Sequence, residues 1–264
     1  VKTLSPELSV AILAAVVITV DLMVRNKRIL PIIAFVGLLV PLYFSIQLWD
    51  VGPKQAFSGT FQVDGFGLFF KYLVLGAAAL VVLSSTEYAK RFGNHQGEYY
   101  ALILFSSTGM MLLASSTELI TLYVALELTA LPIAALAAFI RESRSAESGM
   151  KFLVLSAVSS AVLLYGMVLV YGFTGSSQLN EIGFQISKPG TDLSPALMLG
   201  IVLITAGFGF KIAAVPFQMW APDVYEGAPT PVTGFLSVAS KAAGFAVIIR
   251  VFYTAFGLDT LSIE

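Results

Sequence analysis

The chain has 264 residues, of which 57% are hydrophobic and only 12% are charged, whereas about a quarter of the residues of soluble domains are charged. With a mean hydropathy of +0.87 and a formal net charge of −1, it is expected to lie in a lipid bilayer and not to bind nucleic acid. It has no cysteine and a single histidine, His95, which excludes disulfide frameworks, iron–sulfur ligation and thiolate metal sites.

Long apolar segments predict the secondary structure. A helix needs about 20 mainly apolar residues to cross about 30 Å of hydrocarbon. The segments that meet this requirement are 8–24, 29–48, 65–84, 98–115, 118–140, 149–172, 195–220 and 231–256. Helices are expected because lipid does not tolerate unpaired backbone groups, and a β-barrel would show short alternating segments instead. The sequence therefore predicts an all-α, polytopic transmembrane bundle of about eight spans.

The two longest connections carry further signals. Residues 50–64 contain Gly52-Pro53 and then alternating apolar positions, which predicts a small external β-hairpin. Residues 173–194 are rich in Gly, Ser and Pro and predict an external loop with one short amphipathic turn. We divide the single membrane domain into residues 1–64, with two helices and the hairpin, and residues 65–264, with helices three to eight.

The distribution of Lys and Arg predicts the orientation. The connections after the odd-numbered spans hold seven of these residues, and the opposite set holds three. Cytoplasmic connections retain more positive charge, so the N-terminus is expected outside. The connection between the seventh and eighth spans contains Asp223 and Glu226 but no basic residue. It is placed in the cytoplasm only because successive spans alternate in direction. The N-terminal segment has no cleavage signature, so the first span is expected to act as an uncleaved signal anchor, and the start at Val1 suggests that the chain is incomplete.

Three ionisable residues lie near the middle of predicted spans: Glu127, Lys211 and Lys241. A charge at a helix centre costs at least about 2.5–3.5 kcal/mol on insertion scales, so such a residue is by default a functional-site hypothesis. The alternative is a permanent ion pair between helices, but one acid cannot neutralise two bases. The uneven set therefore favours groups that exchange protons.

Small residues share a helical face with both lysines, and such faces point into the bundle because they let another helix or water approach. They are Gly234, Ser237 and Gly244 for Lys241, and Gly207 and Ala214 for Lys211.

Other basic residues lie nearer the ends of predicted spans. Lys71 and Arg250 are expected to snorkel, with the charge at the membrane interface. Lys151, at the start of the sixth span, is either an interfacial anchor or a functional residue, and both interpretations stay open.

The seventh span ends in a proline-rich segment. Pro216, Pro222, Pro229 and Pro231 lie within 16 residues, so helical hydrogen bonding cannot run through them unbroken. Transporters place ion sites at discontinuous helices, where freed backbone groups line a cavity. An ordinary proline-rich turn between two helices is the alternative interpretation.

A lysine and a glutamate in a polar slot within lipid suit proton transfer. Burial favours the neutral form of a lysine, whereas a neighbouring carboxylate favours the charged form. We therefore expect Lys211 to hold its proton while Glu127 is near, and to release it toward Lys241 when the pair opens.

These residues lie in segments that resemble a known family. KIAAVPFQMWAPDVYEGAPTPVTGFLSVASKAAGFAVIIRVF (211–252), LYVALELTALPIAALAAF (122–139) and the Lys151 region are similar to the proton-translocating, antiporter-like subunit N of respiratory complex I, the NADH:quinone oxidoreductase. The resemblance implies a fold of two inverted repeats, of which this chain holds the first. It also implies the roles of Glu127, Lys211 and Lys241 in proton translocation, with Lys151 linking the path toward a neighbouring subunit.

The resemblance also implies a setting. The subunit is expected in the bacterial plasma (inner) membrane, beside other membrane subunits of the complex. It has no cofactor or metal of its own, because NAD, flavin, iron–sulfur and quinone sites belong to other subunits. The family usually has a histidine where this chain has Gln218, which orders water but cannot titrate.

Three other functions remain open on the sequence. A subunit of a multisubunit cation/proton antiporter shares the helix plan, although the run PDVYEGAPTPV favours subunit N. A membrane-embedded transferase or hydrolase would need an acid–base pair, for which Asp223 and Glu226 are the candidates. A purely structural membrane subunit is the third possibility.

Overall fold

The computed structural model describes residues 2–24, 26–49, 52–188 and 194–257. Arg25, which contributes to the predicted orientation, lies outside the described residues, as do the start of the predicted hairpin connection and the last seven residues of the predicted second part. In the described part the chain is helical apart from one short hairpin, which confirms the all-α class.

Twelve α-helices are described, and short 3₁₀ or π-helical turns continue several of them. The helices are α1 (Ser5–Met23), α2 (Leu30–Gly37), α3 (Leu39–Trp49), α4 (Gly65–Tyr88), α5 (Gln96–Ser115), α6 (Leu119–Ala137), α7 (Ser143–Thr174), α8 (Leu179–Ile186), α9 (Pro195–Ile212), α10 (Trp220–Gly227), α11 (Thr230–Phe235) and α12 (Lys241–Thr254). A π-helical turn, Leu236–Ser240, joins α11 to α12.

Seven helical segments of the described residues are long and apolar enough to cross a membrane. The longest, Gly65–Ser115, has 51 residues and contains both α4 and α5, which turn back on each other at Gly93 (φ 57°, ψ −114°). Divided there, it accounts for two of the eight expected spans. The chain is therefore a multi-pass membrane protein.

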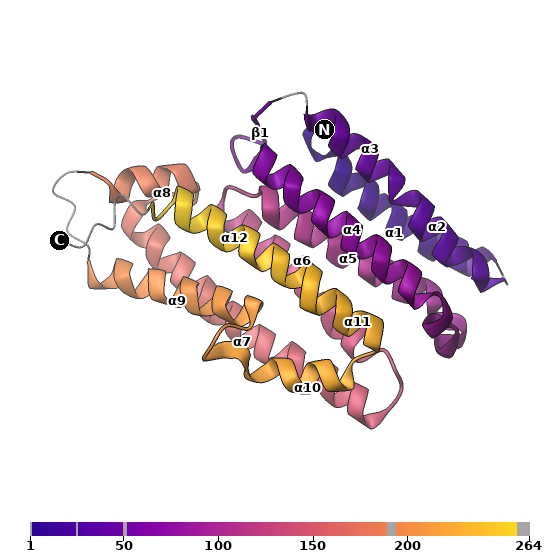
Figure 1. Ribbon diagram of the computed structural model, residues 1–264. Helices are drawn as coiled ribbons and strands as arrows, with labels where there is room; N and C mark the ends of the chain where they lie inside the picture. Colours follow the sequence, from indigo (N-terminus) through magenta and orange to yellow (C-terminus); the bar gives the residue numbers. More distant parts are fainter. Residues whose placement is uncertain (1, 25, 50–51, 189–193, 258–264) are drawn as a thin grey trace.

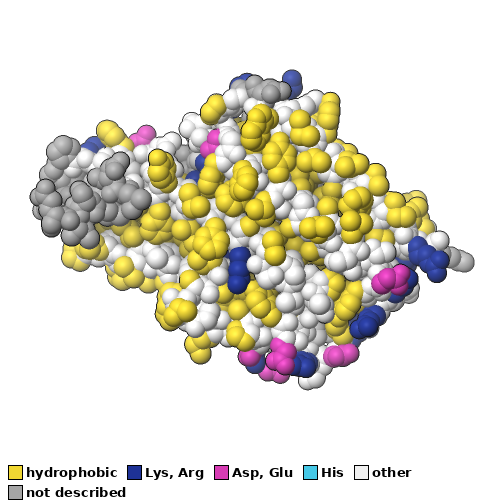
Figure 2. Space-filling model, viewed as in Figure 1, with side chains coloured by type: hydrophobic (Ala, Val, Ile, Leu, Met, Phe, Trp, Pro, Cys, Tyr) yellow, Lys and Arg dark blue, Asp and Glu magenta, His cyan; other side chains and the backbone are white. Residues whose placement is uncertain are grey.

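The long helices run side by side, and their connections alternate between two ends of the bundle (Figure 1). The N-terminus, the hairpin and α8 lie at one end, while the α4–α5 turn, α10 and the α6–α7 connection lie at the other. Hydrophobic side chains are spread over the whole face in Figure 2, and acidic and basic side chains gather mainly along its rims, with one basic side chain near the middle. This is the distribution that a bilayer requires.

The hairpin between α3 and α4 confirms the prediction for that connection. Strand β1 (Lys54–Ala56) pairs antiparallel with β2 (Phe61–Val63), with Lys54 opposite Val63. Phe61 and Val63 are buried, and the Thr117 amide donates to the Thr60 carbonyl (3.0 Å), which fastens the hairpin to the start of α6.

The short helix α8 confirms the amphipathic turn predicted in the second long connection. It buries Leu179, Ile182 and Ile186 along one face, at the spacing that a helix dictates.

Glycines allow close packing between long helices. A Cβ on Gly166 of α7 would lie 2.8 Å from the Gly200 carbonyl oxygen of α9, so neither helix could stay in place. A Cβ on Gly207 would lie 2.6 Å from Leu163, which confirms that the Gly207 face of α9 points into the bundle. This contact places α7 beside the broken end of α9.

Candidate functional site

The seventh predicted span breaks one residue beyond Lys211. Helix α9 ends at Ile212, and Ala213 adopts a left-handed conformation (φ 56°, ψ 43°). The Ala214 amide donates to the Gly209 carbonyl (2.8 Å), which satisfies one carbonyl of the last turn. The chain then passes through Pro216 into α10, so the predicted discontinuous helix is confirmed.

Lys211 lies inside the bundle with an unpaired ammonium. Its side chain is 8% exposed, and its Nζ has no hydrogen-bond partner among the described residues. A cavity of about 20 Å³ adjoins it, bordered on α7 by Ser156, Ser159 and Ser160. A water molecule needs about 10–15 Å³ and two or more polar partners, so this cavity suits one ordered water.

Glu127 approaches this site from α6. Its carboxylate is the charged group that acts electrostatically on Lys211, and its Oε1 is buried without a hydrogen-bond partner in the described part of the chain. The two side chains are therefore within electrostatic reach but not hydrogen-bonded to each other. This is the relation that the predicted opening and closing of the pair requires.

Lys241 begins α12, directly after the π-helical turn. Its Nζ lies 5.5 Å from the centroid of the Tyr225 ring. One turn further, a Cβ on Gly244 would lie 3.4 Å from Lys211 Cγ, so α12 and α9 are in close contact. The prediction for Gly234 is wrong, because that glycine faces open space.

Lys151 is held away from this cavity. It forms ion pairs with Asp223 (2.7 Å) and Glu147 (2.8 Å), and its side chain is 43% exposed. It thereby links α7 to α10, on the far side of the helix break. The structure does not place it with the other three predicted site residues.

Asp223 and Glu226 do not form the acid–base pair that a hydrolase would need. Asp223 pairs with Lys151, and Glu226 pairs with Arg144, so each carboxylate faces a different base of α7. Their pairing instead fixes α10 against α7.

The snorkelling predicted for Lys71 and Arg250 is wrong. Lys71 is fully buried, and its Nζ lies 2.7 Å from Oε1 of Glu7 in α1, without the alignment of a hydrogen bond. Arg250 is 6% exposed and donates to both carboxylate oxygens of Asp64 (2.9 and 3.0 Å) and to the Ala114 carbonyl (2.9 Å). Both basic residues point inward because an acid from another helix or helix end is available there.

Sequence reasoning missed these two acids. Glu7 precedes the predicted first span and Asp64 the predicted third, so neither is among the predicted site residues. In the structure Glu7 lies in the first turn of α1, and Asp64 accepts a hydrogen bond from the Gly67 amide (2.7 Å) as the N-cap of α4. A carboxyl group directly before an apolar segment was the available signal for the second of these.

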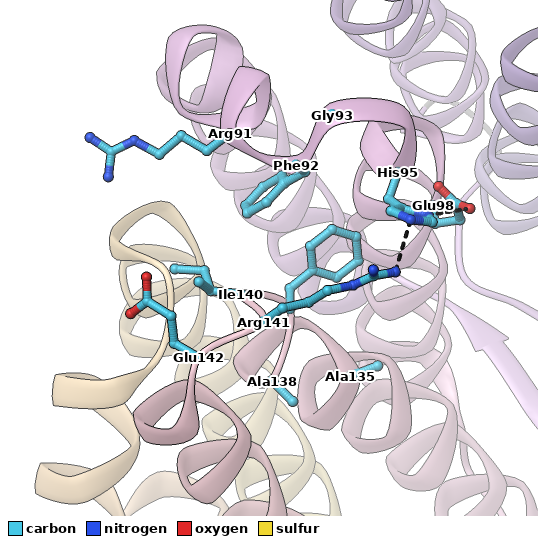
Figure 3. Close-up of a pocket in the computed structure, with 11 residues that line it drawn as sticks. Arg91, Phe92, Gly93, His95, Glu98, Ala135, Ala138, Ile140, Arg141 and Glu142 are labelled. Carbon is cyan, nitrogen blue, oxygen red and sulfur yellow. Dashed lines mark hydrogen bonds and ion pairs between the residues drawn. The ribbon is translucent and has the colours of Figure 1, made fainter.

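A larger pocket opens at the end of the bundle that holds the α4–α5 turn (Figure 3). The guanidinium of Arg141 donates to Nε2 of His95 (3.0 Å), and Nδ1 of His95 lies 3.3 Å from Glu98. Because a guanidinium can only donate, Nε2 must accept, and the proton of a neutral ring then lies on Nδ1. The pocket lining carries two acids and two arginines, and none of the predicted site residues borders it.

The protein is a bundle of apolar helices, and one helix is broken beside a buried lysine. This fold places it in the class of polytopic membrane proteins with a discontinuous helix. Residues 116–262 match the family described as NADH:quinone oxidoreductase/Mrp antiporter, TM. The chain belongs to this family.

Named relatives agree with this assignment. The chain is 44% identical over 256 residues to NADH-quinone oxidoreductase subunit N of Dehalococcoides mccartyi, which covers 95% of this chain and 53% of the relative. The structure of the present chain is similar to a chain of respiratory complex I from Thermus thermophilus with bound aureothin. The TM-score is 0.79 and the sequence identity 34%, and the match covers 93% of this chain and 53% of that one.

A chain of the Mrp complex from a Dietzia species has the same fold, with TM-score 0.77, 20% identity, and coverage of 98% of this chain and 50% of that one. The chain thus spans about half the length of the proteins that it matches.

Proposed function

We propose that this chain forms the first half of a proton-translocating membrane subunit, of the subunit N type, in an NADH:quinone oxidoreductase. It moves protons through Glu127, Lys211 and Lys241, coupled to quinone reduction in other subunits. Lys151 links the path toward a neighbouring subunit. The names of the relatives and the likeness to a complex I chain support this proposal.

One observation carries the proposal: the Lys211 ammonium is buried, unpaired and placed beside the helix break. A static ion pair would have brought a Glu127 oxygen into direct contact with this ammonium, as in the Glu7–Lys71 pair, since a buried charge without compensation is costly. An acid within electrostatic reach and room for about one water allow Lys211 both to hold a proton and to lose it.

The test compares Lys211→Met with Lys211→Arg in the assembled complex. Arginine stays charged in proteins, so it keeps a static ion pair but cannot release a proton. We expect both variants to lower proton uptake per quinone reduced in membrane vesicles, because neither side chain can both hold and release a proton. The exposed Lys188 provides the control, since Lys188→Met should pump normally. Parental pumping by Lys211→Arg would overturn the titrating role, and parental pumping by Lys211→Met would overturn the proposed function.

A second function, a subunit of a multisubunit cation/proton antiporter, is favoured by the description of the family, which names the Mrp antiporter beside the oxidoreductase. Purification of the native complex separates the two. Quinone-reducing activity that co-purifies with the chain supports the oxidoreductase, whereas Na⁺/H⁺ exchange without it supports the antiporter.

The proposal includes a setting for the subunit. It lies in a bacterial inner membrane with its N-terminus outside, beside other membrane subunits of the complex. NAD, flavin, iron–sulfur clusters and quinone are bound by those other subunits, and none by this chain. Residues 65–264 supply the first of two inverted repeats.

A further inference from the structure

Four buried side-chain atoms on α6, α9, α10 and the turn between α9 and α10 have no hydrogen-bond partner among the described residues. They are Lys211 Nζ, Glu127 Oε1, Gln218 Oε1 and the Tyr225 hydroxyl. A buried polar group without a partner costs about 1–3 kcal/mol, and shared water is the usual way to avoid that cost. We therefore expect internal water near the helix break, where the cavity beside Lys211 has room for about one molecule.

Tyr225 is held rigidly within this region. The Thr233 hydroxyl donates to the Tyr225 carbonyl (3.1 Å), which ties α10 to α11. Its ring packs edge-on against Trp220, with ring centroids 5.9 Å apart. The indole of Trp220 in turn donates to the Phe210 carbonyl (3.0 Å), one residue before Lys211. The ring thus belongs to a packed unit that includes the broken end of α9.

The face of the Tyr225 ring meets the second lysine. The 5.5 Å between Lys241 Nζ and the ring centroid is within the range of a cation–π contact. Helix α12 contacts the Lys211 stem one turn further on, at Gly244. The Tyr225 ring therefore contacts Lys241 and packs, through Trp220, on the end of the helix that carries Lys211. Its hydroxyl has no hydrogen-bond partner among the described residues.

We infer that Tyr225 is a positioning residue that orders the water between Lys211 and Lys241, and this inference rests on the proposed function above. The ring holds Lys241 over its face, and the hydroxyl accepts a hydrogen bond from one neighbour while it donates its O–H to the next. A proton that reaches the oxygen from the Lys211 side is matched by one that leaves toward Lys241, so the hydroxyl has one proton before and after the transfer. Gln218 contributes an acceptor to the same water but no proton.

The experiment separates the hydroxyl from the ring. Tyr225→Phe removes only the hydroxyl and keeps the cation–π contact, whereas Tyr225→Leu removes both. Tyr100→Phe is the matched control, because Tyr100 also has a buried hydroxyl without a hydrogen-bond partner, on α5. Each variant is measured in assembled complex in membrane vesicles, as protons moved per quinone reduced, with Lys211→Met in parallel.

We expect Tyr225→Phe to lower the ratio of protons moved to quinone reduced, and Tyr225→Leu to lower it at least as far, while Tyr100→Phe leaves it unchanged. A purely structural tyrosine would give no loss in Tyr225→Phe, because removal of an unpartnered hydroxyl does not weaken the fold. A parental ratio in Tyr225→Phe, together with a loss in Lys211→Met, would overturn this inference alone. A parental ratio in Lys211→Met would overturn the proposed function and this inference with it. An equal loss in Tyr100→Phe would also overturn the inference.

Discussion

The buried ion pair between Glu7 and Lys71 offers a sharp test of the structure. Both side chains are at most 1% exposed, and the two charged atoms lie 2.7 Å apart. The Lys71 ammonium also lies 5.1 Å from the centroid of the Phe61 ring, which belongs to the hairpin. The pair therefore joins α1, α4 and the hairpin at one end of the bundle.

The expected effect of breaking the pair follows from its geometry. With an effective dielectric constant of about 20, two unit charges 2.7 Å apart attract by about 6 kcal/mol, and desolvation of the two ions opposes this with several kcal/mol each. The pair as a whole is thus close to neutral for stability. Removal of one partner leaves a buried charge uncompensated and costs about 3–5 kcal/mol.

Unfolding in mixed detergent micelles measures this prediction. We expect Lys71→Met and Glu7→Gln to destabilise the protein by about 3–5 kcal/mol each, and the double variant Glu7→Leu/Lys71→Met to recover most of that loss. If Lys71→Met unfolded at the parental midpoint, the ammonium would have reached the interface as the snorkelling prediction requires, and the buried pair would be refuted.

Two further predictions concern α6 and α7. Burial raises the pKa of Glu118, but hydrogen bonds from the Thr121 hydroxyl (2.7 Å) and amide (2.8 Å) outweigh it and hold that pKa below its ordinary value. The stabilisation is therefore present at neutral pH and is lost as the pH falls through the folded pKa. We expect Glu118→Ala to lower the free energy of unfolding by about 1 kcal/mol at pH 7 and by much less in acid; equal differences at both pH values would contradict this. Gly166→Ala should destabilise by about 1–3 kcal/mol, because its Cβ would meet the backbone of α9, whereas Gly172→Ala on the same helix has open space and should not; similar unfolding midpoints for the two would argue against the close α7–α9 contact.

The helices and the break in α9 could be predicted from local sequence, and the reason is physical. Insertion into lipid depends on the apolar character of about 20 consecutive residues, and a proline removes a backbone donor wherever it lies. The hairpin and α8 followed from alternation and from helical spacing in the same way. The mid-span positions of Glu127, Lys211 and Lys241 marked them as site candidates before any packing was known.

The burial of each charged side chain and its ion-pair partner could not be predicted in this way. Lys151 and Lys71 both carry a long basic side chain near the end of a predicted span. One is partly exposed between two acids and the other is fully buried against one. Hydropathy does not distinguish these cases, because the difference lies in which helix packs against each lysine.

The sequence by itself determined the class of the protein, its apolar helices, the helix break and the mid-span positions of Glu127, Lys211 and Lys241, since each depends on residues close together in the chain. Only the tertiary structure decided which side chains the charged and polar residues contact. Arg250 reaches Asp64 across 186 positions, and the Tyr225 ring of α10 comes to lie 5.5 Å from the Lys241 ammonium at the start of α12. Electrostatic and hydrogen-bonding partners of buried groups depend on distances of a few ångströms between helices, and the packing of the whole bundle sets those distances.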